Sequence, residues 1–251
     1  MTLLKSTLKG HTMQNQSFEL DKLNKELFVV VPAYNEEKTV AKVVAKLCEM
    51  GYMVVVVDDG SHDKTYSIVK DLQEKYPKQI SIYSHTINRG LGAALKTGLE
   101  ASLRKGAKYM VTFDADCQHD PYDIDNVCKP LKLDEADVVL GDRNFDDMPL
   151  SKKISNQIMN FITLLFYRVK VNDSQSGLRA FNSKATQLLE FHSRGYGVSS
   201  EIVREIKKNH LRFKEVPIKT IYTPYSISKG TNATIGIKIM FKMIIDILKK
   251  F

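Results

Sequence analysis

The chain has 251 residues, and 43% of them are hydrophobic, so it can bury one sizeable core and we expect one domain rather than two. Its 37 Lys and Arg against 29 Asp and Glu give a formal net charge of +8, which suits an anionic partner such as nucleic acid, an acidic membrane surface or a phosphorylated substrate. Three cysteines without metal-ligand spacing argue against a disulfide framework and for a reducing compartment.

No segment of the chain is expected to cross a membrane. Residues 1–26 lack the apolar run and cleavage site of a signal peptide and are interpreted as a polar leader that need not be ordered. The longest apolar stretches, Ile154–Val169 and Ile235–Phe251, are interrupted by polar side chains and fall short of the roughly 20 apolar residues that span a bilayer. Each is interpreted as an amphipathic helix that either packs against the core or a partner, or lies in the plane of a membrane surface.

Short apolar, β-branched runs alternate with amphipathic stretches through the first half of the chain. Strands are expected at Leu27–Val31, Met53–Val57, Ile80–Tyr83 and Tyr109–Phe113, and helices at Val40–Cys48, Thr65–Tyr76 and Leu91–Leu103. Further on, Val138–Leu140 is expected to be a strand and Ile218–Tyr222 an edge strand or an irregular segment. The alternation predicts an α/β fold with a mostly parallel sheet and helices on both faces.

Polar or glycine-bearing segments follow each of the first four expected strands. They are Pro32–Glu37, Asp58–Asp63, Asn88–Gly92 and Asp114–Asp120. Because the carboxyl ends of parallel strands meet at one edge of a sheet, where open α/β folds bind their ligands, we expect the functional site at that edge.

The sharpest of these segments is the acidic turn at Asp114–Gln118. Asp114 and Asp116 are two residues apart just beyond a strand, where both can face one point, and Gln118 adds an amide oxygen. Oxygen ligands of this kind suit Mg²⁺ or Mn²⁺ that is held partly by substrate phosphates. The alternative is an acidic turn that only caps the following helix.

Two further segments offer contacts to a nucleoside. Asp58 and Asp59 end a strand and precede a glycine, so a carboxylate there can accept a hydrogen bond from a base or a ribose. Pro32 ends the first strand, Tyr34 offers a flat face for a base, and Glu36 offers an acceptor. The alternatives are an ordinary Asp-Gly turn and a plain strand-to-helix connection, and they are compatible with the functional interpretation.

One glycine pair invites a different interpretation. Gly90-Leu91-Gly92 precedes a helix, as in a nicotinamide-cofactor fingerprint. However, Leu95 stands where the third glycine belongs, and the segment follows the third strand rather than the first. A dehydrogenase is therefore disfavoured.

The motifs taken together are more specific than any one of them. Pro-x-Tyr-Asn-Glu, Asp-Asp-Gly-Ser-x-Asp, Asn-x-Gly-Leu-Gly-Ala-Ala and Asp-Ala-Asp-x-Gln, in this order and spacing, resemble the inverting family 2 nucleotide-sugar glycosyltransferases with the A-type fold. Gly141–Arg143, Ser174–Phe181 and Tyr225–Gly230 look like the branch of dolichyl-phosphate mannose and glucose synthases and bacterial polyprenyl-phosphate transferases. The resemblance implies a catalytic domain at residues 27–230, followed by a C-terminal amphipathic helix at residues 231–251.

The resemblance also implies roles for individual residues. The metal ligands would be Asp114, Asp116 and Gln118, and the nucleotide-sugar contacts would be Pro32, Tyr34, Glu36, one or both of Asp58 and Asp59, Ala115 and Asp116. The catalytic residues would be Asp116, Arg143, Arg179 and Lys229, and the acceptor phosphate would be met by Lys152, Lys153 and Arg179.

Two departures from that branch bear on the substrates. Lys152 and Lys153 stand near where relatives usually carry Arg beside the acceptor phosphate, and Tyr222–Tyr225 occupies a stretch where mannose synthases tend to carry Arg. The second departure favours a UDP-sugar over GDP-mannose as the donor.

The expected activity is the transfer of a hexose from a UDP-sugar to a polyprenyl phosphate, with inversion, by a peripheral enzyme on the cytoplasmic face of a membrane. An anionic membrane surface is an expected partner and nucleic acid is not, whereas a homo-oligomer or a membrane-protein partner stays open. A family 2 transferase that acts on a glycan or other hydroxyl is the first alternative, and an inactive nucleotide-sugar-binding regulator is the second. A processive synthase is disfavoured because the chain has no Trp for its Gln-x-x-Arg-Trp motif.

Overall fold

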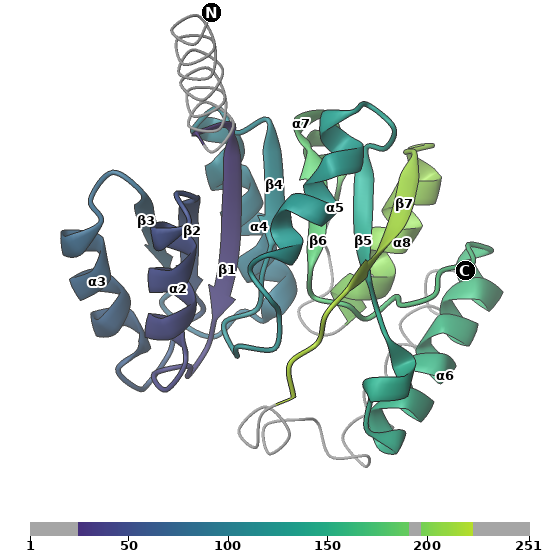
Figure 1. The fold of residues 1–251 in the computed structure, drawn as a ribbon, viewed down its shortest axis with the longest axis horizontal. Coiled ribbons are helices and arrows are strands. Elements are labelled where there is room, and N and C mark those ends of the chain that lie inside the picture. Colours follow the sequence, from purple (N-terminus) through teal and green to yellow (C-terminus); the bar gives the residue numbers. More distant parts are fainter. Residues whose placement is uncertain (1–24, 191–196, 223–251) are drawn as a thin grey trace, which may run out of the picture.

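A seven-stranded sheet organises the computed structural model, which describes residues 25–190 and 197–222 (Figure 1). The strands are β1 Leu27–Ala33, β2 Met53–Asp58, β3 Ile80–Ser84, β4 Tyr109–Thr112, β5 Val138–Arg143, β6 Arg179–Asn182 and β7 Phe213–Ile218. Their order across the sheet is β3-β2-β1-β4-β6-β5-β7, and β6 runs antiparallel to its neighbours β4 and β5 while the other pairs are parallel.

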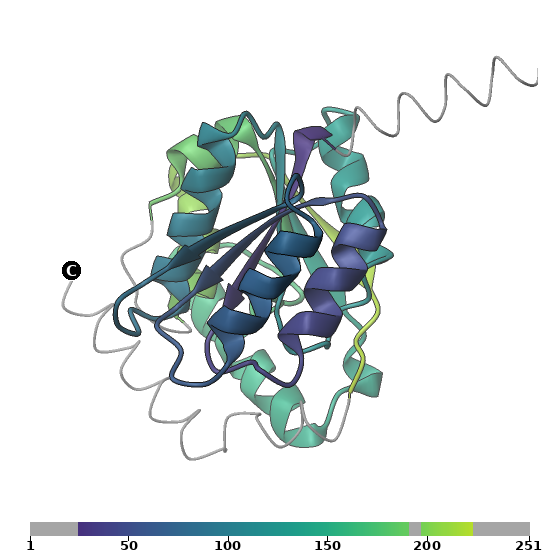
Figure 2. The same cartoon turned by 90° about the vertical axis from the view of Figure 1, so that its left-hand side faces the viewer.

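Helices cover both faces of this sheet, which confirms the predicted α/β layering (Figure 2). They are α2 Val40–Glu49, α3 Thr65–Lys75, α4 Leu91–Arg104, α5 Asp123–Lys132, α6 Leu150–Tyr167, α7 Ser183–Leu188 and α8 Gly197–Lys208, with a short 3₁₀ helix η1 at Phe145–Asp147. α2, α3 and α5 pack on one face, and α4, α7 and α8 pack on the other. In the part of the chain that the structure describes, no helix is long and apolar enough to cross a membrane.

The first strand shows why the central strands are apolar along their whole length. Every residue of β1 is buried. Val29 and Val31 face the core under α2 and α5, whereas Phe28 and Val30 face the core under α4. A strand that is covered on both faces has no side that needs polar residues. Polar and apolar residues therefore do not alternate along it, and the strand is a continuous apolar run.

Pro32 was expected to end the first strand, but β1 continues to Ala33. Ala33 accepts a hydrogen bond from the amide of Asp59 on the β2 side, so the main chain of Pro32 faces the β4 side. The β4 pairing has already stopped at Val30 opposite Thr112. The amide that proline lacks is therefore not needed there, and a proline is tolerated inside a paired strand.

The prediction was less accurate in the second half of the chain. The last strand is β7, which ends at Ile218, and beyond it Thr220 makes only an isolated antiparallel bridge to His119. Of the two alternatives for Ile218–Tyr222, the irregular segment is therefore the one found, and the edge strand lies just before it, where the charged residues and Pro217 of β7 hid it. The expected helix at Ile154–Val169 is α6, which begins at Leu150 and ends at Tyr167.

α4 approaches the sheet closely through a glycine. A Cβ atom at Gly98 would lie 2.3 Å from Val30 Cγ1 and 3.2 Å from Val57 Cγ2. Both valines are fully buried and β-branched, so neither side chain can move aside easily. α4 can therefore lie this close to β1 and β2 only because Gly98 has no side chain.

We predict that Gly98→Ala lowers the free energy of unfolding by about 1–3 kcal/mol because it overpacks this contact. At an ordinary helix position a Gly→Ala substitution would raise the free energy of unfolding by up to about 1 kcal/mol. Urea denaturation measures the sign, with Glu100→Ala on the exposed side of α4 as the control, expected within about 0.5 kcal/mol of the parent. A Gly98→Ala chain more stable than the parent would contradict the packing described here.

Candidate active site

The loops that follow β1 and β2 are joined to each other by side chain to main chain hydrogen bonds. The amide of Asn35 donates to Ser61 Oγ at 3.0 Å, and the Asn35 side chain accepts from the amide of His62 at 2.9 Å. Asn35 has a positive φ of 54°, which Asn tolerates better than most residues. Tyr34 is thereby left 38% exposed at the edge of the sheet, with its ring edge-on to His62 at 6.5 Å between centroids.

Asp59 organises the neighbouring loop. It is buried, and its carboxylate lies 2.6 Å from His85 Nδ1 and accepts from the amides of Arg89 and Gly90 at 2.9 and 2.7 Å. Asp58 is also buried and accepts from the Ser84 hydroxyl at 3.0 Å. Both acids therefore accept hydrogen bonds from residues of the β3 end and the loop after it, beside the expected nucleoside pocket.

The acidic turn after β4 brings the three expected metal ligands together. Cys117 adopts a left-handed conformation with φ 63°, so the chain folds back on itself. The Asp116 carboxylate accepts from the Gln118 amide at 3.0 Å, and the Gln118 side-chain amide also lies against it. Asp114 Oδ2 lies 3.1 Å from Nε2 of His119, which is buried.

The two carboxylates have opposite electrostatic environments. Burial raises the pKa of Asp116, and the charge of Asp114 raises it further. Burial alone would also raise the pKa of Asp114, but the hydrogen bond from His119 and the charges of Arg179 and Arg143 bring it below its ordinary value. Two carboxylates that repel each other form a place where a divalent cation is favoured.

The described residues contain no group of three or more His, Cys, Asp and Glu side chains that could hold a metal alone. Two carboxylates and one amide instead match the coordination preferences of Mg²⁺ and Mn²⁺. These ions bind oxygen ligands and keep other coordination positions for water and phosphate. Asp114, Asp116 and Gln118 therefore fit a cation that is completed by a phosphorylated ligand.

Positive side chains lie next to the acidic turn. Arg143 forms a bidentate pair with the buried Asp173, with Nε to Oδ2 at 2.6 Å and Nη2 to Oδ1 at 2.9 Å, and Asn156 donates to the same carboxylate at 2.7 Å. Arg179 is buried and donates to Ser199 Oγ at 2.7 Å. Burial lowers the pKa of Arg179 to about 10, against the opposing effect of the nearby carboxylates, so it remains a cation at neutral pH.

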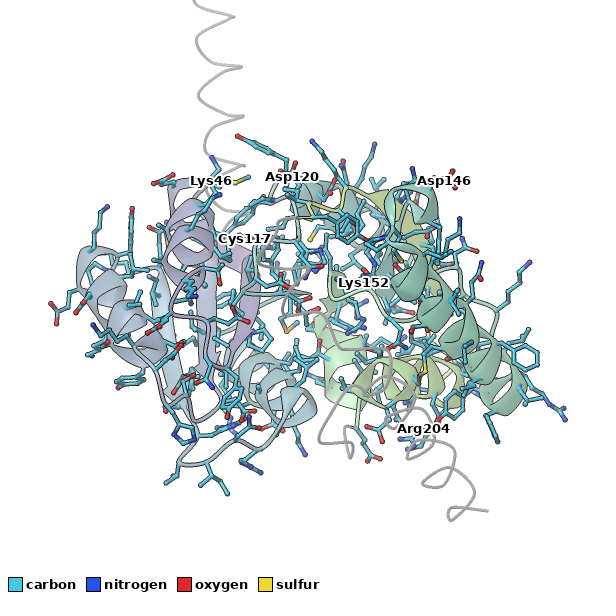
Figure 3. The ribbon with its side chains drawn as sticks, turned by 90° about the horizontal axis from the view of Figure 1, so that it is seen from below. Lys46, Cys117, Asp120, Asp146, Lys152 and Arg204 are labelled. Carbon is cyan, nitrogen blue, oxygen red and sulfur yellow. The ribbon has the colours of Figure 1, made fainter. Side chains whose placement is uncertain are left out.

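The two lysines of α6 meet different partners, and Figure 3 labels Lys152 together with Asp146, which is the partner of the other lysine. Lys152 Nζ lies 5.4 Å from the ring centroid of Tyr222. Its pKa is lowered by burial and by the charge of Arg143, against the attraction of Asp116, so Lys152 is near enough to both residues to sense their charges. Lys153 instead pairs with Asp146 at 3.6 Å. The remaining expected cation, Lys229, lies outside the described residues.

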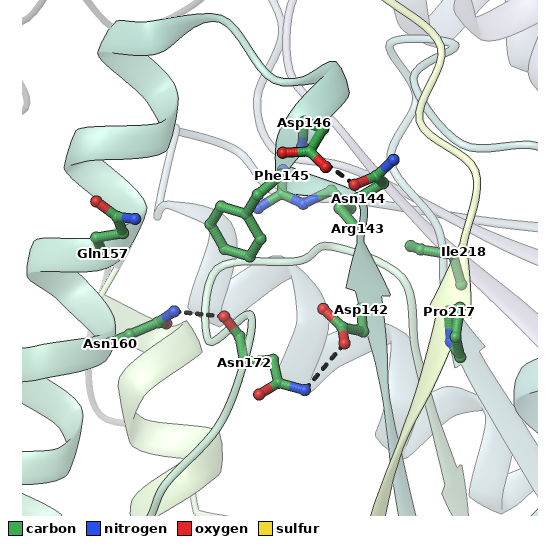
Figure 4. Close-up of a pocket in the computed structure, with 10 residues that line it drawn as sticks. All are labelled: Asp142, Arg143, Asn144, Phe145, Asp146, Gln157, Asn160, Asn172, Pro217 and Ile218. Atoms are coloured by element: carbon green, nitrogen blue, oxygen red, sulfur yellow. Dashed lines mark hydrogen bonds between the residues drawn. The ribbon is translucent and has the colours of Figure 1, made fainter.

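A pocket of about 610 Å³ opens beside Arg143, between α6 and the ends of β5 and β7 (Figure 4). Its lining is mainly polar and consists of Asp142, Arg143, Asn144, Phe145, Asp146, Gln157, Asn160, Asn172, Pro217 and Ile218. Asn172 donates to Asp142 at 3.0 Å and so braces one wall. The pocket therefore provides open space beside Arg143.

Gly177 touches the Asp114 carboxylate directly. A Cβ atom at Gly177 would lie 2.0 Å from Asp114 Oδ2, which no side chain can do. The Gly177 carbonyl accepts from Thr112 Oγ1 at 2.7 Å, which holds the segment before β6 against the end of β4. The position of Asp114 thus depends on the absence of a side chain sixty residues away in sequence.

Sequence reasoning missed four residues of this site: His119, Asp173, Gly177 and Ser199. Gly177 belongs to a segment that had been singled out, and His119 directly follows the expected metal ligands, so their proximity in sequence was a usable signal. The sequence gave no signal for Asp173 and Ser199, because each is recognised only through the arginine that it contacts, Arg143 and Arg179 respectively.

Comparison with known proteins agrees with this geometry. The family model described as glycosyl transferase family 2 matches residues 28–215. Over 241 residues the chain is 42% identical to a UDP-N-acetylglucosamine–dolichyl-phosphate N-acetylglucosaminyltransferase of Methanococcus voltae, with 88% of this chain and 96% of that protein covered. It is 26% identical over 226 residues to a polyprenol monophosphomannose synthase of Mycolicibacterium smegmatis, with 86% and 84% covered.

Among solved structures, a glucosyl-3-phosphoglycerate synthase of Mycobacterium tuberculosis in complex with Mn²⁺, UDP and phosphoglyceric acid is similar, with a TM-score of 0.66 and 18% identity. The similarity covers 90% of this chain and 81% of that one. It confirms the A-type fold predicted from the sequence.

We predict that Gly177→Ala folds but binds Mn²⁺ about 10- to 100-fold more weakly than the parent, the usual effect of disturbing a group that orients a ligand. The reason is that the new methyl group must displace the Asp114 carboxylate. Calorimetric titration with Mn²⁺ in the presence of UDP measures the affinity, and thermal unfolding without metal reports whether the fold is intact. Unchanged affinity in a folded variant would show that Asp114 is not a ligand.

Proposed function

We propose that this chain, which belongs to glycosyl transferase family 2, transfers a hexose from a UDP-sugar to a polyprenyl phosphate with inversion at the anomeric carbon. That it is a glycosyltransferase follows from the family match and from its relatives. One observation carries the finer proposal: an acidic turn suited to a metal–diphosphate lies beside Arg143, Arg179 and Lys152, which are suited to a second phosphate. Such a site can hold two anions side by side.

The donor is proposed to lie over the ends of β1, β2 and β4. Tyr34 is exposed there and can stack on a base, and Pro32, Glu36, Asp58, Asp59 and Ala115 surround the same edge. Asp58 and Asp59 already accept hydrogen bonds from within the chain. They are therefore proposed to shape the pocket as well as to contact the donor. The Methanococcus voltae relative is named for UDP-N-acetylglucosamine, which makes that the first donor to test.

Asp114, Asp116 and Gln118 are proposed to hold Mg²⁺ or Mn²⁺ together with the donor diphosphate. The similar synthase of known structure was solved with Mn²⁺ and UDP, which supports this assignment. A cation bound there would stabilise the negative charge that develops on the leaving diphosphate. The chain itself contributes the positions of the three ligands and the cations around them.

The acceptor phosphate is proposed to lie near Arg143, Lys152 and Arg179. A phosphate monoester is mostly anionic at neutral pH, so it can attack the sugar without a general base. The carboxylates that line or adjoin the pocket beside Arg143 each have a partner: Asp142 has Asn172, Asp173 has Arg143, and Asp146 has Lys153. What these residues offer is positive charge, which favours a phosphate over a hydroxyl acceptor. A single displacement without a protein nucleophile inverts the anomeric centre.

α6 is proposed to face the membrane that carries such an acceptor. One side of the helix exposes an apolar stripe of Leu150, Ile154, Ile158, Phe161 and Leu165, and Leu150 is as much as 72% exposed. Lys153 and Arg168 add positive charge on and beside the helix without any acidic residue within it. An exposed apolar stripe with basic neighbours is typical of a helix that lies on an anionic membrane surface. We therefore propose peripheral attachment to the cytoplasmic face.

The direct experiment incubates the purified chain with Mn²⁺, labelled UDP-N-acetylglucosamine and undecaprenyl phosphate. The expected product is a lipid-linked sugar with an inverted anomeric bond. A chain that ignores polyprenyl phosphates but glycosylates a soluble alcohol would be a hydroxyl-acceptor transferase. A chain that binds the donor but neither transfers nor hydrolyses it would be a regulator, and either result would overturn the proposal.

We predict that Asp116→Ala lowers transfer by several orders of magnitude while the chain remains folded, because the charge on the leaving diphosphate is then poorly stabilised. Activity should also disappear in excess chelator and return with Mn²⁺ or Mg²⁺. Asp125→Ala, an exposed acid on α5, is the control and should transfer like the parent. Full activity in excess chelator would exclude the metal role.

We predict that the double variant Phe161→Gln, Leu165→Gln binds anionic vesicles at least roughly tenfold more weakly than the parent, because each side chain loses apolar area that lipid would bury. Raised salt should weaken the parent's binding through screening. Tyr66→Gln, at an exposed aromatic position on α3, is the control. Equal vesicle binding by the double variant and the parent would place the membrane contact elsewhere.

A further inference from the structure

His119 occupies an unusual position for a polar side chain. It is only 4% exposed, although it directly follows the acidic turn. Its ring stands edge-on to Phe113 at 5.4 Å between centroids, and its backbone is fixed by the bridge to Thr220. The ring therefore has a single orientation, with Nε2 at 3.1 Å from Asp114 Oδ2.

The two ring nitrogens have different surroundings. Nδ1 is buried and has no hydrogen-bond partner among the described residues. Nε2 faces the Asp114 carboxylate, and an ionised carboxylate can only accept, so Nε2 is the nitrogen that donates. His119 thus acts as a fixed donor toward one oxygen of a carboxylate.

The Asp114 carboxylate is held from two sides. His119 lies against Oδ2, and the main chain of Gly177 lies so close to the carboxylate that a Cβ atom there would come within 2.0 Å of Oδ2 and 2.8 Å of Oδ1. These two contacts restrict the orientation of the carboxylate. A ligand that is fixed in advance loses less conformational freedom when a metal binds.

From this geometry we infer that His119 is a positioning residue that orients Asp114 for metal binding, an inference that rests on the proposed metal role of Asp114. This role requires no contact between the ring and the substrate. Its contribution is a hydrogen bond of defined length and direction, so another side chain that delivers an N–H to the same point should replace it.

Two amide variants separate this role from simple packing. The side-chain nitrogen of Gln can reach the point that Nε2 occupies, whereas that of Asn matches the nearer Nδ1 and cannot reach Asp114. We expect His119→Gln to bind Mn²⁺ in the presence of UDP within about threefold of the parent, and His119→Asn to bind it about 10- to 100-fold more weakly. Electron paramagnetic resonance of free Mn²⁺ measures both affinities.

The kinetics should follow the same order. His119→Asn should need more Mn²⁺ for half-maximal transfer but approach the parent's kcat when Mn²⁺ is saturating. Thermal unfolding without metal, expected to be similar for the two variants, reports whether each is folded. The inference would be overturned if His119→Asn bound Mn²⁺ as tightly as the parent, or if both variants lost the same affinity. A parent chain that binds no Mn²⁺ would also overturn it.

A parent chain that binds Mn²⁺ and UDP but transfers nothing to polyprenyl phosphate would refute only the proposed function, because the comparison of affinities would still hold.

Discussion

The site depends on the charge balance around one buried arginine. Arg179 begins β6, opposite Thr112 of β4, and its side chain is buried beneath the edge of the sheet. An isolated charge in such a place would cost several kcal/mol, and the nearby carboxylates of Asp114 and Asp173 offset that cost. Against the effect of burial, the hydrogen bond from His119 brings the pKa of Asp114 below its ordinary value, and the charges of Arg179 and Arg143 lower it further, so that Asp114 stays ionised next to Asp116. The acidic and basic parts of the site therefore stabilise each other before any ligand binds.

This balance is possible because an antiparallel strand enters a parallel sheet. β1, β2, β3 and β4 form one parallel unit whose carboxyl edge carries the proposed nucleotide contacts, and β5 and β7 carry the residues near the pocket beside Arg143. β6 runs between β4 and β5 in the opposite direction, so its beginning, with Gly177 and Arg179, lies at the same edge as their ends. One reversed strand thus joins the donor side of the site to its acceptor side.

The sequence was sufficient to predict the first half of the fold and the position of the acidic turn. The strands there are covered on both faces, so their apolar runs are continuous, and the residues that follow them are polar. β6 escaped prediction because it has only four residues and begins with a charged one, Arg179. Arg179 is recognisable as part of a strand only from its pairing with Thr112 of β4 and Leu140 of β5. Lys152 and Lys153 are adjacent in sequence but meet different partners, because successive residues of a helix point about 100° apart.

The most direct test of the account is an experimental structure of the chain with Mg²⁺ and UDP. The account predicts a cation within about 2.0–2.1 Å of a carboxylate oxygen of Asp116. It also predicts the diphosphate between that cation and the side chains of Arg143 and Lys152, with Asp114 still in contact with His119. A cation bound away from the acidic turn, or a diphosphate that avoids the arginines, would contradict the account.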